Sequence, residues 1–323
     1  MSHHTAQEHL DDYLSDAHSI EEQALVQMKR ASKIAGDPAL ADIFARHEAE
    51  TEQHEQLVRE RMAAHDAKPS AIKEAVMKMG GVAFVLFAKA NPDTPGKLTA
   101  HGYSYEHLEI GSYELLARVA QRAGDLETVA VARRILEQER AMAQRLEEHF
   151  DDAVEASLRD LQPDDMGKQV AKYLADAHAL ETQAISLLEG GQKIVGDDRL
   201  AALMEEHLAE TREHERLTRE RLEALGESPS RLKDAALGMG GLNWGGFFAA
   251  HPDTPGKLAA FAYAFEHLEI AGYELLKRVA RRAGDEATVA MAERILTDER
   301  GAAEKIAADF DHAAEAALAA QAG

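Results

Sequence analysis

Apolar residues recur at spacings of three and four along several long segments of the chain, which is the pattern of amphipathic helices. In the first half this pattern predicts long helices over about residues 7–35, 38–64, 97–123 and 125–156. A shorter and strongly apolar helix, interrupted by two glycines, is predicted over about 70–90. Long amphipathic helices with short connections predict a helical bundle that hides the apolar stripes of its members.

The predicted helix ends carry residues that usually stop and start helices. Gly36 is a natural C-cap, and Asp37-Pro38 supply an N-cap followed by a proline in the first turn. Gly124-Asp125 stand in the same way between the third and fourth long helices. One crossover element between the second and third long helices is typical of the ferritin type of four-helix bundle.

The chain contains its own sequence twice. Tyr13, Glu21, His54 and Glu139 recur 160 positions later as Tyr173, Glu181, His214 and Glu299. The longest identical stretch, PDTPGKL, occupies residues 92–98 and 252–258. A period this long exceeds the roughly 20 to 50 residues of a solenoid unit, so each copy should be a complete domain.

We therefore predict an all-α fold of two tandem ferritin-like four-helix bundles, each with an extra short helix between helices 2 and 3. The first bundle should span residues 1–158 and the second 169–323. The segment 159–168 carries the proline, glycine and acidic residues of a linker.

Composition and charge narrow the functions. The 323 residues carry a formal net charge of −22, which argues against nucleic-acid and anionic-membrane partners and would attract cations. Solvated helix faces account for much of this charge. The chain has no cysteine, which excludes disulfides, zinc–thiolate sites, iron–sulfur clusters and a thiol nucleophile. No apolar run approaches membrane-spanning length and the first residues do not resemble a signal peptide, so we expect a cytoplasmic protein.

Acidic residues lie on the apolar faces of the predicted helices. The stripe of the second helix is interrupted at its middle by two histidines and Glu50. The other three helices bring Glu21, Glu106, Glu109 and Glu139 to the same level. Burying even one unpaired carboxylate costs several kcal/mol, and like charges nearby add to that cost. Five carboxylates in one core therefore require positive partners.

Two metal ions per domain would supply most of the missing positive charge, because few arginines lie within the stripes. Carboxylate and imidazole ligands without sulfur fit iron or manganese, and the ligand types also allow zinc. A buried salt-bridge network is the alternative. The predicted metal ligands are Glu21, Glu50, His54, Glu106, Glu109 and Glu139 in the first copy and Glu181, Glu210, His214, Glu266, Glu269 and Glu299 in the second.

The sequence leaves open which imidazoles bind metal. Di-iron bundles combine one Glu from each of two helices with Glu-x-x-His from each of the other two. This chain instead offers His47-x-x-Glu50-x-x-x-His54 on one helix and Glu106-x-x-Glu109 on another. An imidazole beside carboxylates either binds the metal or hydrogen bonds to a ligand, and Glu109 has the same two alternatives.

Other polar residues near the predicted site have less direct roles. His18 is a further candidate for a hydrogen bond to a ligand. His107 directly follows Glu106, so on a helix it points away from the site and is expected in surface or interface packing. Tyr113 and Tyr273 are expected to be core aromatics.

These residues form motifs that resemble the YciE/YciF ferroxidase-like family of the ferritin-like superfamily, over nearly the whole of both copies. The motifs are Asp16-x-His18-x-x-Glu21-x-Gln23, His47-x-x-Glu50-Thr51, Glu106-His107-x-Glu109-Ile110-x-x-Tyr113 and Leu136-x-x-Glu139. The resemblance implies a ferritin-like fold, a di-iron-type centre, a ferroxidase or peroxide-handling role in the stress response, and dimerisation. We expect the two copies to form an intrachain pseudo-dimer, with further homo-oligomers open.

The leading functional hypothesis is an oxidoreductase that uses O2 or H2O2 to oxidise Fe(II) at a two-metal centre. A manganese-catalase-like dismutation of peroxide could use the same ligands, and would release oxygen without ferrous iron. A metal-free helical scaffold or stress-response partner is the third hypothesis, and would bind no metal after reconstitution.

Overall fold

The computed structural model describes residues 6–67, 94–229 and 254–322, and all regular elements in these ranges are helices. Repeat one contains α1 (Ala6–Ile34), α2 (Pro38–Ala64), α4 (Thr94–Ala123), α5 (Leu126–Glu148) and α6 (Phe150–Leu158). Repeat two contains η1 (Pro163–Asp165), α7 (Met166–Ile194), α8 (Asp198–Ala224), α11 (Thr254–Ala283), α12 (Glu286–Ala308) and α13 (Phe310–Ala322). The predicted short helix at 70–90 lies outside the described residues.

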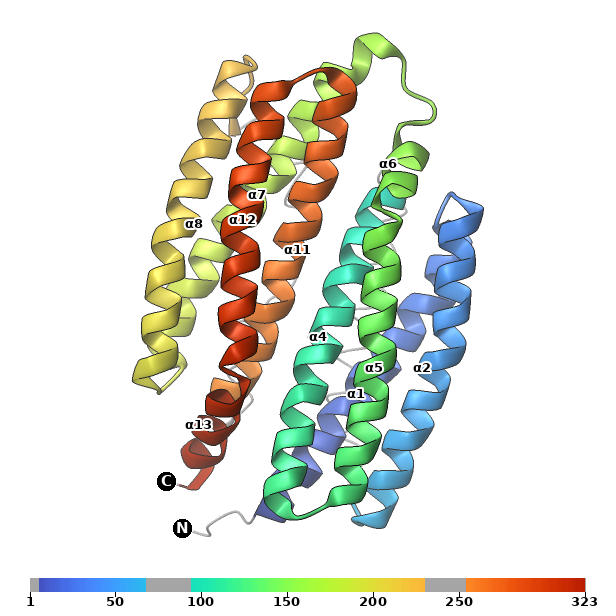
Figure 1. The fold of residues 1–323 in the computed structure, drawn as a ribbon, viewed down its shortest axis with the longest axis vertical. Coiled ribbons are helices and arrows are strands. Elements are labelled where there is room, and N and C mark those ends of the chain that lie inside the picture. The colour runs from blue at the N-terminus through green and yellow to red at the C-terminus, as the bar shows by residue number, and fades with distance from the viewer. Residues whose placement is uncertain (1–5, 68–93, 230–253, 323) are drawn as a thin grey trace.

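Each repeat is a four-helix bundle made of two antiparallel hairpins, α1–α2 with α4–α5 and α7–α8 with α11–α12 (Figure 1). The start of α2 lies beside the start of α4, because a Cβ on Gly36 would lie 2.9 Å from Pro95 Cγ. At the other end Arg61 of α2 pairs with Asp125 at the start of α5, with Nη2 and Oδ2 3.0 Å apart. α2 and α4 therefore run parallel, which is the topology of bundles with one long crossover connection.

The predicted caps are present. Gly36 adopts a φ of +71°, a conformation that glycine reaches without strain. The Asp37 side chain accepts hydrogen bonds from the backbone amides of Ala39 and Leu40, and Pro38 occupies the first turn of α2. α4 begins at Thr94, three residues before the predicted start, because Pro95 is tolerated in the first turn of a helix.

The fourth long helix of each bundle is bent, which the sequence pattern did not predict. α5 ends at Glu148, His149 adopts φ −106° and ψ 14°, and α6 continues from Phe150. Because of the bend, α6 packs against both α4 and α11. There Asp151 pairs with Arg278 of repeat two, with 3.2 Å between Oδ2 and Nε. The bend thus serves the contact between the repeats.

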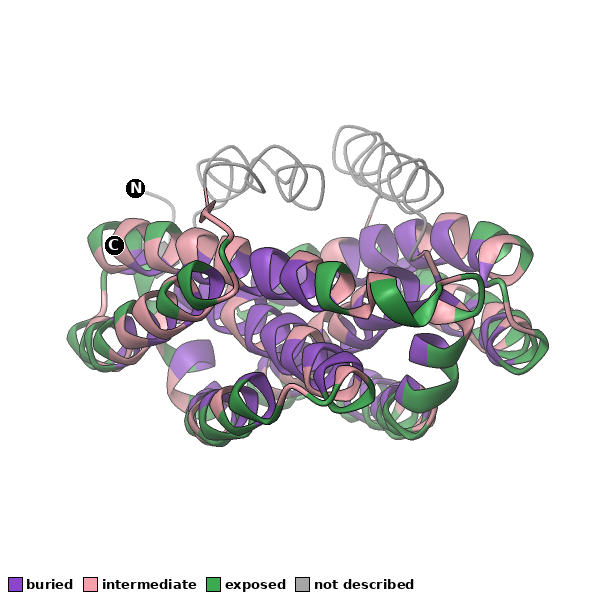
Figure 2. Ribbon diagram, turned by 90° about the horizontal axis from the view of Figure 1, so that it is seen from above, coloured by how far each residue is buried: buried purple, intermediate pink, exposed green. Residues whose placement is uncertain are grey.

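The repeats meet along α4 and α11, which form the most extensive contact between them in the described part of the chain. Figure 2 shows the buried residues concentrated on the inner helices. The contact is symmetric, because equivalent residues face each other: the rings of His107 and His267 stack with centroids 3.4 Å apart. Ser104 Oγ likewise donates to the Ala264 carbonyl at 2.7 Å. His107 therefore lies in interface packing, as predicted.

The described part of the identical stretch, residues 94–98 and 254–258, lies at this interface. Lys97 Nζ lies 3.4 Å from Asp176 Oδ2 of repeat two, and Lys257 Nζ lies 2.7 Å from Asp16 Oδ2 of repeat one. A Cβ on Gly96 would lie 2.9 Å from the Tyr173 hydroxyl, so a larger side chain would push the repeats apart. These identical residues therefore contribute to the pairing of the repeats.

Among the described residues, no helix combines the length and the apolar character that crossing a bilayer requires.

Candidate metal centre

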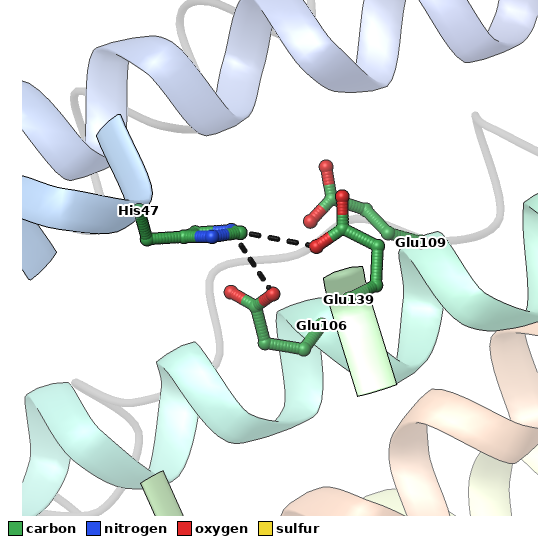
Figure 3. A group of neighbouring side chains, drawn as sticks. All are labelled: His47, Glu106, Glu109 and Glu139. Atoms are coloured by element: carbon green, nitrogen blue, oxygen red, sulfur yellow. Dashed lines mark ion pairs between the residues drawn. The ribbon is translucent and has the colours of Figure 1, made fainter. Parts of the chain in front are cut away.

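Four buried side chains from three helices meet in the middle of repeat one (Figure 3). His47 comes from α2, Glu106 and Glu109 from α4, and Glu139 from α5, and each residue is 0% exposed. One potential ligand atom of each lies within 4.8 Å of the others. We call these four residues the central group of repeat one; its counterpart in repeat two is His207, Glu266, Glu269 and Glu299.

A second set of ligand atoms adjoins the first and shares a carboxylate with it. This side group consists of Glu21 from α1, His54 from α2 and Glu139. His54 Nδ1 lies 2.7 Å from one oxygen of Glu139, and His47 Nε2 lies 3.4 Å from the other. Glu139 is therefore placed between two imidazoles. The side group of repeat two is Glu181, His214 and Glu299.

The carboxylates of the central group lack the hydrogen bonds that buried oxygens normally have. Neither oxygen of Glu109 has a hydrogen-bond partner, and the oxygens of Glu106 and Glu139 face only the imidazoles of His47 and His54. In repeat two both oxygens of Glu269 are likewise unpaired. Native proteins satisfy nearly all buried polar groups, so unpaired buried oxygens at one point need a physical reason. A cation bound among them would supply that reason, because carboxylate oxygens and imidazole nitrogens are common metal ligands.

Both imidazoles are held from outside the cluster. His47 Nδ1 lies 3.0 Å from Glu50 Oε2, and His54 Nε2 lies 3.0 Å from Gln138 Oε1. Because these acceptors take the outer N–H, each ring turns its other nitrogen toward the carboxylates. Metal-binding histidines are commonly oriented in this way by an acceptor behind the ring.

Burial and mutual repulsion favour the protonated form of these carboxyls. Burial, together with the neighbouring Glu139, raises the pKa of Glu21 to about 8. Burial raises the pKa of Glu139 to about 7, although the hydrogen bond from His54 lowers it. Burial also raises the pKa of Glu109 well above its usual range, with Glu139 and Glu21 adding to the shift. Cations that bind here would therefore displace protons.

The same surroundings favour the charged form of the histidines, because the nearby carboxylates raise their pKa values. Burial alone would lower the pKa of His47, but the Glu106 carboxylate raises it overall. The pKa of His54 is likewise lowered by burial and raised overall by Glu139. In the absence of a metal ion, protonated imidazoles would supply part of the positive charge that the centre needs.

The structure brings together most of the residues predicted from the sequence. Glu21, His54, Glu106, Glu109 and Glu139 all lie in the two groups, and so do their counterparts in repeat two. Glu50 lies outside them, with its side chain 27% exposed. It contacts His47 and Arg145, whose Nη2 lies 3.0 Å from Glu50 Oε2, and these contacts lower its pKa to about 2. Glu210 lies in the same way beside His207, at 3.2 Å.

His47 belongs to the central group although the sequence left its role open. The signal that distinguishes it is its separation from His54: seven residues are nearly two helical turns, so both rings lie on one face. Glu50 lies three residues from His47 and is rotated toward the edge of that face. Helical periodicity alone is too coarse to separate two such positions.

One further contact, from a tyrosine, completes each centre. Tyr113, fully buried as predicted for a core aromatic, donates its hydroxyl hydrogen bond to Glu21 Oε1, and Tyr273 does the same to Glu181. His18 lies apart from both groups, in a smaller set with Glu22 and Glu55 between α1 and α2. The tyrosine hydroxyls were not predicted to contact the site.

A family model described as "Domain of unknown function (DUF892)" matches the chain twice, over residues 5–159 and 169–319. No solved structure matches the chain.

Proposed function

The chain belongs to the DUF892 family, with one copy in each half, and we propose that each copy binds two iron or manganese ions and acts as a ferroxidase or peroxide-handling oxidoreductase. The observation that carries this proposal is the shared glutamate, Glu139 or Glu299, between two buried sets of nitrogen and oxygen atoms. The motif Glu106-His107-x-Glu109-Ile110-x-x-Tyr113 further supports a YciE/YciF ferroxidase-like protein within this family.

In repeat one, His47, Glu106 and Glu109 would hold one ion, and Glu21 with His54 would hold the other. Glu139 would contact both. The predicted ligand role of Glu50 would require its carboxylate to leave Arg145, so we propose that it orients His47 instead. Two bound ions would supply the one-electron steps by which ferrous iron reduces O2 or H2O2.

The side chains around the centre would manage protons and exclude water. The carboxyls of Glu21, Glu109 and Glu139 have raised pKa values, so they would release protons as ferrous iron binds and accept them when it leaves. The Tyr113 hydroxyl would hold Glu21 in place through its hydrogen bond. Complete burial of these residues keeps bulk water from the reacting atoms.

Metal content tests the proposal directly. The protein, purified without chelator and reconstituted with Fe(II), should hold about four ions per chain, and the double variant Glu139→Gln, Glu299→Gln should lose most of them. Glu137→Gln is the matched control, because Glu137 is exposed on the same helix. Absence of metal after reconstitution would favour the scaffold.

Turnover distinguishes the two enzymatic hypotheses. Consumption of O2 or peroxide in proportion to added Fe(II) supports the ferroxidase. Sustained oxygen release from peroxide without Fe(II), in the manganese-loaded protein, supports the catalase.

A further inference from the structure

Repeat two contains a cavity of about 40 Å³ that leads from the surface to its central group. The cavity lies between α7, α8, α11 and α12, which form the left half of the molecule in Figure 1. Aliphatic side chains, among them Leu188, Met204 and Ala302, form its walls. Its buried end reaches His207 and Glu266, and its outer end is bounded by Lys305, whose side chain is 44% exposed.

Met204 of α8 lines the cavity and leans toward Gly191 of α7. A Cβ on Gly191 of α7 would lie only 3.0 Å from Met204 Sδ, so the missing side chain makes room for this orientation. Opposite Met204, α11 carries Ala262, which also lines the cavity. Gly191 and Met204 thus leave this space open, and the Ala262 side chain forms part of its wall.

Repeat one has different residues at the same three positions, and they close the space. The equivalents of Gly191, Met204 and Ala262 are Ala31, Phe44 and Gly102. The Phe44 ring packs against Gly102 of α4: a Cβ on Gly102 would lie 3.2 Å from Phe44 Cε1. Met142 replaces Ala302 and adds further volume at the same level.

The metal-ligand candidates are less exposed in repeat one than in repeat two. Phe44 is 1% exposed, and both His47 and Glu106 are 0% exposed. In repeat two the equivalent His207 is 7% exposed and Glu266 is 3% exposed. The same ligand positions are thus sealed in repeat one and reached from outside in repeat two.

We propose that this cavity admits a small uncharged oxidant, O2 or H2O2, to the centre of repeat two, and that the centre of repeat one reacts more slowly because Phe44 and Met142 close the same route. This inference rests on the proposed oxidation of ferrous iron. A water molecule needs roughly 10–15 Å³ of such volume, so the cavity has room for a diatomic molecule or a peroxide and excludes larger organic substrates. Its aliphatic walls disfavour ions, which would lose their hydration.

The electron balance is the same for both repeats. Two ferrous ions give two electrons to one H2O2, which takes up two protons and becomes two water molecules. With O2 as oxidant, two electrons and two protons yield one H2O2. The proposal concerns only how fast the oxidant arrives at each centre.

Xenon under pressure tests the cavity without any metal, because small apolar cavities bind this gas. Crystals of the metal-free protein should show xenon beside Met204 and Ala302, and none at Phe44. The exchange variant Gly191→Ala, Met204→Phe, Ala262→Gly, which gives repeat two the residues of repeat one, should lose this xenon. Equal occupancy of the two repeats, or no xenon in either, would overturn the proposal. Because no metal is involved, the result is independent of the proposed function.

Rapid-mixing kinetics of the Fe(II)-loaded protein test the consequence. Oxidation should occur in two phases of equal amplitude that differ in rate by about tenfold or more, a barrier difference of about 1.4 kcal/mol. The exchange variant should lose the fast phase. The reverse exchange in repeat one, Ala31→Gly, Phe44→Met, Gly102→Ala, should speed up the slow phase, and it serves as the second variant if the first fails to fold.

The kinetics should be measured separately with O2 and with H2O2. The oxidant that uses the cavity is the one that gives distinct fast and slow phases. A single phase with both oxidants would overturn the proposal. Protein that binds xenon as expected but takes up no iron would leave the cavity in place and refute the ferroxidase function.

Discussion

The two repeats carry the same ligand groups at the same positions but surround them differently. His54 forms a hydrogen bond with Gln138 in repeat one, whereas its counterpart His214 forms one with Asp298, with Nε2 and Oδ2 3.2 Å apart. Arg145 pairs with Glu50 in repeat one. Lys305, the equivalent of Arg145 in repeat two, instead pairs with Glu206, with 2.8 Å between Nζ and Oε1. In each repeat the shared glutamate contacts both histidines, whereas the residues behind those histidines differ between the repeats.

The largest expected effect separates ligands from orienting residues. His47→Gln removes a nitrogen from the central group and should lower the metal affinity of repeat one by more than about a hundredfold, since changes to residues that only hydrogen bond to a metal ligand already cost about 10–100-fold. Glu50→Gln alters only the hydrogen bond to His47, so its loss of metal affinity should lie within about 10–100-fold. Competition against a metal chelator measures both. Equal losses would return Glu50 to its predicted role as a ligand.

The same pair of changes in repeat two, His207→Gln and Glu210→Gln, sharpens the comparison. Glu210 lies beside His207 as Glu50 lies beside His47, so the ratio of the two losses should be similar in the two repeats. A ratio that differs between the repeats would show that the open cavity alters how the metal is held.

A second prediction concerns the pH dependence of the metal-free protein. The pKa of Glu21 is raised from 4.5 to about 8, and that of Glu266 from 4.5 to about 7, chiefly by burial. The folded protein therefore holds protons that the unfolded chain has lost, so the free energy of unfolding should fall as the pH rises from about 4.5 to about 8, by about 1.4 kcal/mol per pH unit for each such proton.

The histidines act in the same direction. Burial would lower the pKa of His214, but Glu299 raises it from 6.5 to about 9, so its stabilising contribution is complete below 6.5 and is lost as the pH rises toward 9. Urea unfolding between pH 5 and 9, with and without metal, measures the sum. Bound cations replace the protons, so the metal-loaded protein should show a flatter curve; a metal-free curve that rises with pH would contradict the burial of these carboxyls.

A third prediction tests the residues behind the side groups. Asp298→Asn removes a charge behind His214 and should lower the metal affinity of repeat two by about tenfold, while Gln138→Asn, which shortens a neutral acceptor, should change repeat one less. Metal titration of each variant by calorimetry distinguishes them. Equal effects would mean that the acceptor's charge is irrelevant.

The smallest expected effect is shared by the repeats. Tyr113→Phe and Tyr273→Phe each remove a buried hydrogen bond to a carboxylate and should lower the free energy of unfolding by about 1–2 kcal/mol. Thermal unfolding of the two variants should give matching losses. Unequal losses would indicate that the two side groups differ despite their similar geometry.

Helical periodicity was enough to predict the bundles and to place Glu21, Glu106, Glu109 and Glu139 together, because a charged residue on an apolar stripe is conspicuous. It did not predict the bend at His149, because no glycine or proline marks that position; the bend brings α6 against α4 of its own repeat and α11 of the other.

The cavity of repeat two could not be predicted from the sequence either. It depends on the direction in which the Met204 side chain leans, which is decided by the missing side chain of Gly191 on another helix. The domain boundaries at 158 and 169 and the identity of the metal remain predictions.

The symmetric contact between α4 and α11 has one more consequence. A protein that assembles from two identical subunits repeats every substitution on both sides of its axis, so its two centres must stay alike. Here both sides are encoded in a single polypeptide, and a change such as phenylalanine to methionine alters one side alone. Covalent linkage thus frees the halves to specialise while the contact that joins them keeps its symmetry.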